Sequence, residues 1–297
     1  MPTSSHAEPN GSTRRRKLHF SVKSLCWKVA RSIALAYGLL ILTMVGCQRS
    51  MIYYPEKESA STLKNRASKQ GLEAWTDDDG QLIGWKTPAS ATAEDTNAVV
   101  IFHGNAGYAL HRNYFVTAFQ DMKIDRSWQI YLFEYPGYGA RDGKPSENAI
   151  KNAAVDAVKP LLDTQGAVYL TGESLGAGVA CHLAGRFPNA IDGLLLITPF
   201  PNLASVGRHH YPYLPVNLLL RDRFNNKRPL EAYNARIAFV VAEQDQVIPP
   251  NLGVELHDSY DGPKQMWRLS QSGHNTISYH HSAQWWTEAV KFLAEDN

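Results

Sequence analysis

The stretch Ala167-Val168-Tyr169-Leu170-Thr171-Gly172-Glu173-Ser174-Leu175-Gly176-Ala177-Gly178 decides the fold of this chain. An apolar run typical of a buried strand leads directly into Gly-x-Ser-x-Gly, and small residues typical of a closely packed helix follow. Glycines two positions before and two after Ser174 let the strand and helix backbones approach each other. The serine can then stand on a sharp turn at the head of the helix. This pattern predicts a nucleophile elbow.

Strand-like and helix-like patterns alternate along the rest of the chain. We expect strands at Leu72–Trp75, Leu82–Thr87, Ala98–Phe102, Gln129–Glu134, Ala167–Thr171, Gly193–Thr198, Ile237–Ala242 and Gln265–Leu269. We expect helices over about 107–121, 147–163, 175–187, 249–260 and 282–294. This alternation predicts an α/β fold whose mostly parallel central sheet carries helices on both faces.

The rhythm breaks at residues 199–232, which are rich in Pro, Asn and Arg. We interpret this segment as a small cap insertion over the site, containing a short helix at Val216–Arg221. Loops at the carboxyl ends of the strands carry the chemistry in such sheets. We therefore expect this insertion to set substrate specificity.

Three residues meet the needs of nucleophilic catalysis. A serine hydroxyl such as that of Ser174 is a poor nucleophile until a base takes its proton, and histidine suits that task near neutral pH. Of the 11 histidines, His274 is placed for it, in a loop after an expected strand. A carboxylate must hold the imidazole, and Asp245 lies between nucleophile and histidine in the order typical of this arrangement. Glu243 is its close rival.

Acyl transfer also needs two backbone N–H groups aimed at the developing oxyanion. The N–H of Leu175 at the head of the expected helix is one candidate. The other comes from Gly104-Asn105-Ala106-Gly107, where we choose Asn105 first and Ala106 as the alternative. The segment Tyr135-Pro136-Gly137-Tyr138-Gly139 is either a scaffold turn or a wall of the pocket, with Tyr138 as the expected substrate contact.

The order of these motifs resembles the α/β-hydrolase family, most of all the bud-emergence-protein branch of serine hydrolases, near sequences called serine aminopeptidase-like or acylglycerol-lipase-like. The likeness spans about residues 50 to 294. It implies the α/β-hydrolase fold and a triad of Ser174, Asp245 and His274. Two positions depart from that branch: Glu134 stands where aspartate is common, and Ala242-Glu243 replaces the usual His-Gly before the acid. Neither change removes a catalytic atom.

The N-terminal segment has the pattern of a targeting sequence. Seven Lys and Arg residues, beginning with Arg14–Lys17, precede the uncharged block Ile33–Val45 of 13 residues, and no acidic residue lies between Glu8 and Glu56. A transmembrane helix needs about 17 to 25 residues, so this block better suits a signal-peptide core. The following Gly46-Cys47-Gln48 resembles a bacterial lipoprotein signal, which implies lipidation of Cys47.

We therefore expect residues 1–46 to be a signal peptide or membrane anchor and 47–297 to be the hydrolase domain. The first hypothesis is a lipoprotein, the second an uncleaved signal anchor, and the third an amphipathic or buried helix. The first two leave the positive charges in the cytoplasm and predict an exported, membrane-tethered protein. For a bacterial lipoprotein, we expect it to face the periplasm.

Composition excludes several other classes of protein. The formal net charge is +2, and no basic stripe with interleaved aromatics runs through the body, so we expect no nucleic-acid partner. The cysteines Cys26, Cys47 and Cys181 give no disulfide framework or metal motif, and we expect no metal and no organic cofactor. We interpret Cys181 as a small buried hydrophobe.

These observations together predict a serine hydrolase that cleaves ester or thioester bonds through an acyl-enzyme intermediate. A small acyl ester, thioester or lipid is the expected substrate. A peptidase or amidase using the same residues is the alternative within the enzyme class. A non-catalytic binding lipoprotein with a hydrolase fold is the alternative outside it.

Overall fold

Alternating side chains of the central strands face two different helical layers. The computed structural model describes residues 22–89, 96–122, 127–280 and 282–295. In strand β4 (Asn97–Phe102), Ala98, Val100 and Phe102 belong to one hydrophobic cluster, whereas Val99 and Ile101 belong to the other. Because successive side chains of a strand point to opposite faces, this division shows a sheet that is buried on both sides.

The sheet has eight strands in the order β10-β9-β8-β7-β4-β6-β3-β2. Besides β4, they are β2 (Glu73–Thr76), β3 (Leu82–Lys86), β6 (Trp128–Phe133), β7 (Val168–Glu173), β8 (Gly193–Ile197), β9 (Arg236–Ala242) and β10 (Lys264–Leu269). Strands β2 and β3 pair antiparallel, and β3 is antiparallel to β6, while the other neighbours are parallel. The predicted fold class is confirmed, and each expected strand appears within two residues of its predicted bounds.

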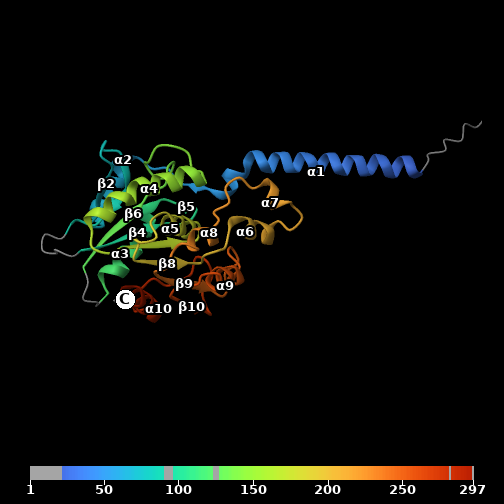
Figure 1. The fold of residues 1–297 in the computed structure, drawn as a ribbon. Coiled ribbons are helices and arrows are strands. Elements are labelled where there is room, and N and C mark those ends of the chain that lie inside the picture. The colour runs from blue at the N-terminus through green and yellow to red at the C-terminus, as the bar shows by residue number, and fades with distance from the viewer. Residues whose placement is uncertain (1–21, 90–95, 123–126, 281, 296–297) are drawn as a thin grey trace, which may run out of the picture. The chain divides into compact units, whose positions relative to one another are not determined.

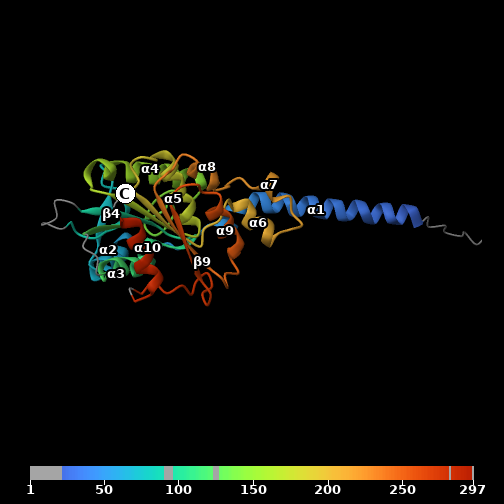
Figure 2. The ribbon, with the colours of Figure 1, turned by 60° about the horizontal axis from the view of Figure 1, so that its bottom comes forward.

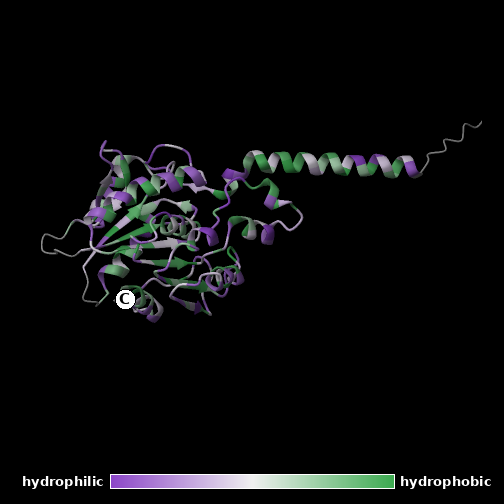
Figure 3. Cartoon of the chain, in the orientation of Figure 1, coloured by the Kyte–Doolittle hydropathy of each residue, from purple (hydrophilic) through white to green (hydrophobic). Residues whose placement is uncertain are grey.

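Helices cover both faces of the sheet (Figures 1 and 2). Buried residues of α4 (Glu147–Thr164), α5 (Leu175–Arg186) and α9 (Pro250–Asp258) share one cluster, while those of α2 (Ala60–Lys69), α3 (Asn113–Gln120) and α10 (Gln284–Ala294) share the other. The strands are largely apolar, and the covering helices combine apolar and polar residues (Figure 3). This contrast is typical of amphipathic helices packed on a core sheet.

The helix expected over about 107–121 is shorter in the structure. Residues Ala106–Gly107 form the short strand β5, which pairs with β1 (Tyr54–Pro55); the 3-10 helix η1 (Ala109–Arg112) follows, and only then does α3 begin. Pairing in β5 takes these residues out of helical geometry. Helix α2 was not expected, because it buries only Leu63 and Ala67 and so has little apolar periodicity.

The segment between β8 and β9 contains α6 (Leu203–His210), α7 (Val216–Leu219) and α8 (Lys227–Leu230). Its second half rests on α5. A Cβ at Gly178 would lie 2.7 Å from the Phe224 ring, and one at Gly185 would lie 2.6 Å from the Pro229 carbonyl oxygen. These glycines of α5 therefore let the segment pack closely against the helix that follows Ser174.

Helix α1 (Val22–Ile52) has 31 residues, more than the 13-residue block on which the prediction of a short signal core rested. Among the described residues, it is the helix long and apolar enough to cross a membrane. The chain divides into two units, Met1–Met44 and Val45–Asn297, so the last turns of α1 belong to the larger unit. Arg14–Lys17 lie outside the described residues.

The close packing of α5 against the end of β4 predicts that one methyl group added at Gly176 destabilises the protein. In Gly176→Ala, the new Cβ would lie 2.0 Å from the Phe102 carbonyl oxygen, a backbone atom that cannot rotate away. We expect the free energy of unfolding to fall by about 1–3 kcal/mol, measured by chemical denaturation in detergent. Gly273→Ala is the matched control, because the atom nearest to its Cβ would be the Gln244 carbonyl oxygen at 3.4 Å, an ordinary contact distance. Equal stability of the two variants would contradict the packing argument.

Candidate active site

Ser174 stands on a strained turn between β7 and α5. Its φ of 53° and ψ of −113° lie outside the regions that most residues adopt. A Cβ at Gly172 would be 2.5 Å from the Ala177 Cα, so the two glycines of the motif flank a backbone crossing with no room for a side chain. The geometry is that of a nucleophile elbow, as the sequence predicts.

His274 and Asp245 meet through a short hydrogen bond. The distance from His274 Nδ1 to Asp245 Oδ2 is 2.7 Å, and Asp245 is buried. The other carboxylate oxygen accepts hydrogen bonds of 2.8 Å from the N–H groups of Val247 and Ile248. These bonds hold the carboxylate in one orientation, which in turn fixes the imidazole.

The rival carboxylate, Glu243, points to a different partner. Its Oε1 lies 2.6 Å from Arg268 Nε at the protein surface. The structure thus pairs His274 with Asp245 and leaves Glu243 in a surface ion pair. Ser174, Asp245 and His274 follow β7, β9 and β10, whose carboxyl ends share one edge of the parallel sheet.

The loop after β4 approaches the elbow. A Cβ at Gly104 would lie 3.8 Å from the Ser174 Cβ. On the other side, Leu175 is the first residue of α5, and the N–H of a first helical residue has no acceptor within its own helix. Backbone donors from these two segments are therefore the candidates for holding an oxyanion beside Ser174.

Hydrogen bonds fix the peptide between Asn105 and Ala106. The Asn105 carbonyl accepts from the Tyr138 hydroxyl at 2.7 Å and from the Tyr54 N–H at 2.9 Å. Since carbonyl and N–H point in opposite directions in a trans peptide, these bonds also set the direction of the Ala106 N–H. The Asn105 side chain donates to the Ile52 carbonyl at 2.8 Å, which anchors the same residue a second time.

Tyr138 lies elsewhere than expected for a substrate contact. Its side chain is fully buried, packs against the rings of His103 and Tyr135, and holds Asn105 through its hydroxyl. Tyr135 donates in the same way to the His103 carbonyl at 2.5 Å. The structure therefore corresponds to the scaffold interpretation of this turn.

Glu134 stands where the branch that this sequence resembles commonly has aspartate. Its carboxylate has partners in the structure. Both of its carboxylate oxygens lie 3.1 Å from the Ala109 N–H at the start of η1, and its side chain is fully buried. The His103 Nε2 lies 3.4 Å from Glu134 Oε1, and His103 Nδ1 bonds the Gly104 carbonyl at 2.7 Å. Glu134 and His103 therefore hold the loop after β4 in place.

Residues 52–56 are part of the site, and sequence reasoning missed them. The Tyr54 N–H bonds Asn105, and the Glu56 N–H donates to the Gly107 carbonyl at 3.1 Å. Together these bonds form the parallel pair β1–β5. A strand of two residues carries no periodic signal, and its partner lies about 50 residues along the chain, so nothing in the sequence pointed to this pairing.

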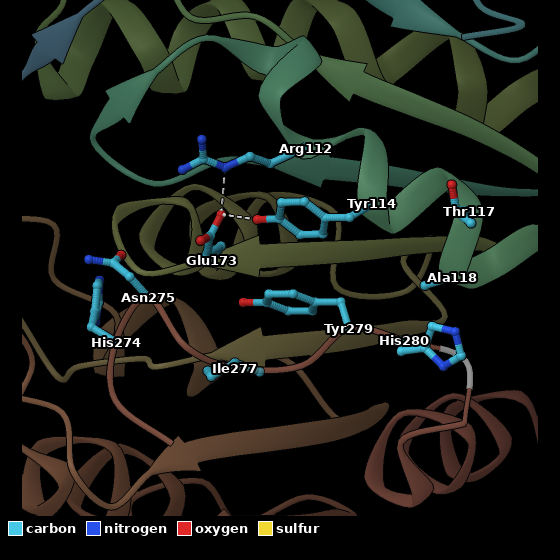
Figure 4. Close-up of a pocket in the computed structure, with 10 residues that line it drawn as sticks. All are labelled: Arg112, Tyr114, Thr117, Ala118, Glu173, His274, Asn275, Ile277, Tyr279 and His280. Atoms are coloured by element: carbon cyan, nitrogen blue, oxygen red, sulfur yellow. Dashed lines mark hydrogen bonds and ion pairs between the residues drawn. The ribbon is translucent and has the colours of Figure 1, made fainter. Parts of the chain in front are cut away.

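A cavity of about 580 Å³ adjoins His274. Figure 4 shows the rings of Tyr114 and Tyr279 stacked over one another, with His274 and Asn275 toward one end and His280 toward the other. The ring centroids of the two tyrosines are 4.6 Å apart. No residue of the segment 199–232 lines this cavity, although the sequence analysis assigned specificity to that segment.

An ion pair forms the polar wall of the cavity. Arg112 Nε lies 2.8 Å from Glu173 Oε2, and the Tyr114 hydroxyl donates to the same oxygen at 3.3 Å. Burial, followed by the nearby Glu173 carboxylate, raises the pKa of Tyr114 above its ordinary value. Tyr114 therefore remains a neutral hydrogen-bond donor at physiological pH.

Cys181 is not a second nucleophile, and the described histidines belong to no group that could hold a metal ion. Cys181 is fully buried on α5, and burial raises the pKa of its thiol to about 12, so it is inert as a nucleophile. Within the described ranges, no group of three or more His, Cys, Asp or Glu side chains could hold a metal ion.

Comparisons with known proteins agree with the observed fold. Residues 97–232 match the family described as alpha/beta hydrolase fold. An uncharacterised protein of Mycobacterium tuberculosis strain H37Rv is 31% identical over 254 residues, which cover 83% of this chain and 87% of that protein. The chain belongs to the alpha/beta hydrolase family.

Other relatives of this hydrolase carry functional names. The lysophosphatidylserine lipase ABHD12 of Xenopus tropicalis is 28% identical over 204 residues, covering 62% of this chain and 51% of that protein, so the match spans about half of the relative's length. Protein bem46 of Schizosaccharomyces pombe is 22% identical over 75% of this chain and 78% of its own. The solved structure of Est1E from Butyrivibrio proteoclasticus has the same fold, with a TM-score of 0.58, 15% identity and coverage of 76% of this chain and 100% of its own.

Because β1 pairs with β5 in the loop beside Ser174, we expect the residues directly after α1 to affect activity. Tyr54→Pro removes the N–H that holds the Asn105 carbonyl, and Tyr54→Ala keeps that N–H while removing the exposed ring. We expect the proline variant to lower kcat about 10- to 100-fold because the oxyanion donors lose their alignment. The alanine variant should stay near wild type. Similar kcat values for the two, measured on a soluble ester, would show that the pairing does not position the loop.

Proposed function

We propose that this hydrolase is a membrane-associated serine hydrolase that cleaves carboxylic ester or thioester bonds through an acyl-enzyme intermediate. The observation that carries the proposal is the strained Ser174 at the same sheet edge as the 2.7 Å His274–Asp245 pair. A turn with such dihedrals is costly in free energy, and such strain occurs mainly at functional sites. A buried carboxylate that orients a histidine supplies the base that the serine needs.

In the proposed mechanism, the Ser174 hydroxyl attacks the acyl carbonyl while His274 takes its proton. Asp245 holds the imidazole tautomer and stabilises the imidazolium that forms. The N–H of Leu175 and that of Asn105, or of Ala106 as the alternative, stabilise the oxyanion. His274 then returns the proton to the leaving alcohol or thiol, and a water activated by the same base releases the acid.

Three observations support an acyl lipid as the substrate class. A relative that this chain matches over about half of the relative's length is named a lysophosphatidylserine lipase. The cavity beside His274 is lined by two stacked tyrosine rings and by the Arg112–Glu173 pair. A substrate in this cavity therefore contacts an apolar wall and a polar wall. Helix α1 is long and apolar enough to place the protein in a membrane, where acyl esters are abundant.

Substitutions in the three site residues test the mechanism. Ser174→Ala and His274→Ala should each lower turnover of a nitrophenyl ester at least about 10³-fold, because nucleophile and base act as one unit. Asp245→Asn should also reduce turnover, with more residual activity. Glu243→Gln is the matched control, since this carboxylate pairs with Arg268 at the surface.

A fluorophosphonate probe supplies the covalent readout. It should label the wild-type chain and fail to label Ser174→Ala. A folded wild type that is not labelled would favour a non-catalytic binding protein. A His274→Ala enzyme that retains more than about a tenth of wild-type turnover would remove this histidine from the mechanism. An aminoacyl anilide assayed beside an ester series separates an amidase from an esterase.

Export and tethering are tested at Cys47. We propose that the chain is exported and held at the membrane, with lipidated Cys47 as the first residue of the mature protein and the uncleaved α1 as the alternative. Intact mass of the membrane-extracted protein distinguishes the two. A lipoprotein has lost residues 1–46 and gained the mass of its acyl chains, a change that Cys47→Ala abolishes. An unmodified chain that begins at residue 1 would disprove lipidation and leave α1 as the anchor.

A further inference from the structure

Exposed apolar side chains gather on one part of the unit Val45–Asn297. Among its described residues, the exposed large hydrophobics are Met51, Tyr54, Tyr211, Tyr213, Leu218 and Val247, which we call the interfacial patch. Tyr213 is 89% exposed and Leu218 is 83% exposed. Single exposed apolar residues are ordinary on a protein surface, but a group of them marks an interaction surface.

Hydrogen bonds join the segments that carry the interfacial patch. Near the end of α1, the Gln48 side chain donates to the Leu219 carbonyl at 3.3 Å and accepts from the Arg221 N–H at 2.7 Å. On the other side of the patch, His210 Nε2 lies 2.8 Å from the Val247 carbonyl. The end of α1, the segment after β8 and the loop that carries Asp245 therefore form one continuous region.

An ionic cluster around the buried Asp222 lies next to the patch. Asp222 accepts from Arg49 Nε at 3.1 Å and from the Tyr53 hydroxyl at 3.0 Å, and it is almost fully buried. This cluster attaches the segment of Leu218 to the residues at the end of α1. Leu218 thus lies close to the point where that helix ends.

The segment 199–224, which carries Tyr211, Tyr213 and Leu218, has an excess of positive charge. Arg208, Arg221 and Arg223 are exposed in it. Asp222 is the one acidic residue between 199 and 224 in the sequence, and its charge is balanced by Arg49. Tyrosine rings, an exposed leucine and arginines together are the composition that proteins use at the boundary of anionic lipid headgroups and acyl chains.

We infer that the interfacial patch docks on the surface of the bilayer that holds α1, with Tyr213 and Leu218 at the boundary of headgroups and acyl chains. The inference rests on the proposed membrane association of the chain, with the uncleaved α1 as its anchor. Because Val247 belongs to the loop of Asp245, docking holds the site close to the lipid surface. An acyl lipid can then reach Ser174 with a short passage through water.

Fluorescence quenching in vesicles tests the docking. The full chain, with Cys26→Ser and Cys47→Ser, is reconstituted into phosphatidylcholine vesicles that contain phosphatidylglycerol and brominated phosphatidylcholine. Single cysteines at Tyr213→Cys or Leu218→Cys carry a nitrobenzoxadiazole label, while Cys181 is buried and remains unlabelled. Leu35→Cys in α1 reports insertion of the anchor. Asn189→Cys, exposed at the opposite end of β8, is the matched aqueous control.

We expect brominated lipid to quench the labels at 213, 218 and 35, and to leave the label at 189 unquenched. Labels at 213 and 218 that behave like the one at 189, while 35 is quenched, would overturn the docking of the patch. An unquenched label at 35 would instead refute the anchoring by α1 and, with it, this inference. Fluorophosphonate labelling of the same samples reports separately on the proposed catalysis.

A kinetic comparison gives the functional consequence. The double variant Tyr213→Ser, Leu218→Ser should hydrolyse an acyl ester embedded in the vesicles several-fold more slowly than wild type. Its rate on a water-soluble short-chain ester should not change, because neither residue lies in the site. An equal reduction on both substrates, or no reduction on either, would contradict the inference.

Discussion

The structure depends on the close approach of α5 to the central strands at Ser174. The serine can occupy its strained backbone conformation only because Gly172 and Gly176 leave the crossing backbones in contact. The Phe102 carbonyl lies where a side chain at Gly176 would be, so the elbow and the end of β4 form one rigid unit. The same packing that buries α5 therefore places both Ser174 and the neighbouring loop, whose backbone N–H groups are the candidate oxyanion donors.

That loop is held on several sides by residues with no direct chemical role. Tyr135 and Tyr138 bind its carbonyls from the turn after β6, and Glu134 holds the start of η1. The strand β1 closes the network from the N-terminal side. Catalytic sites require donors aligned before the reaction begins, and a loop whose carbonyls at His103, Asn105 and Gly107 accept from fixed partners meets that requirement.

Residues at the end of α1 and directly after it connect the segment after β8 with the site. Tyr53 and Arg49 bind Asp222 of the segment after β8, and Tyr54 binds the loop of Asn105. These few residues thus contact both the surface that we assign to lipid and the loop that we assign to the oxyanion. An acyl-lipid hydrolase benefits from such an arrangement, because its substrate and its anchor share one bilayer.

The sequence by itself determined the sheet, the elbow and the candidate residues of the site. Local patterns carried this information: apolar runs defined the strands, and the glycines around Ser174 and the order of Asp245 and His274 defined the motif. Tertiary structure alone decided the choice of Asp245 over Glu243, the burial of Tyr138 and the role of residues 52–56. Each of these depends on contacts between segments distant in sequence, and such contacts leave no periodic signal. The length of α1 was also decided there, because helical geometry continues past the uncharged block into flanking turns that contain Lys23, Lys28, Arg31 and Arg49.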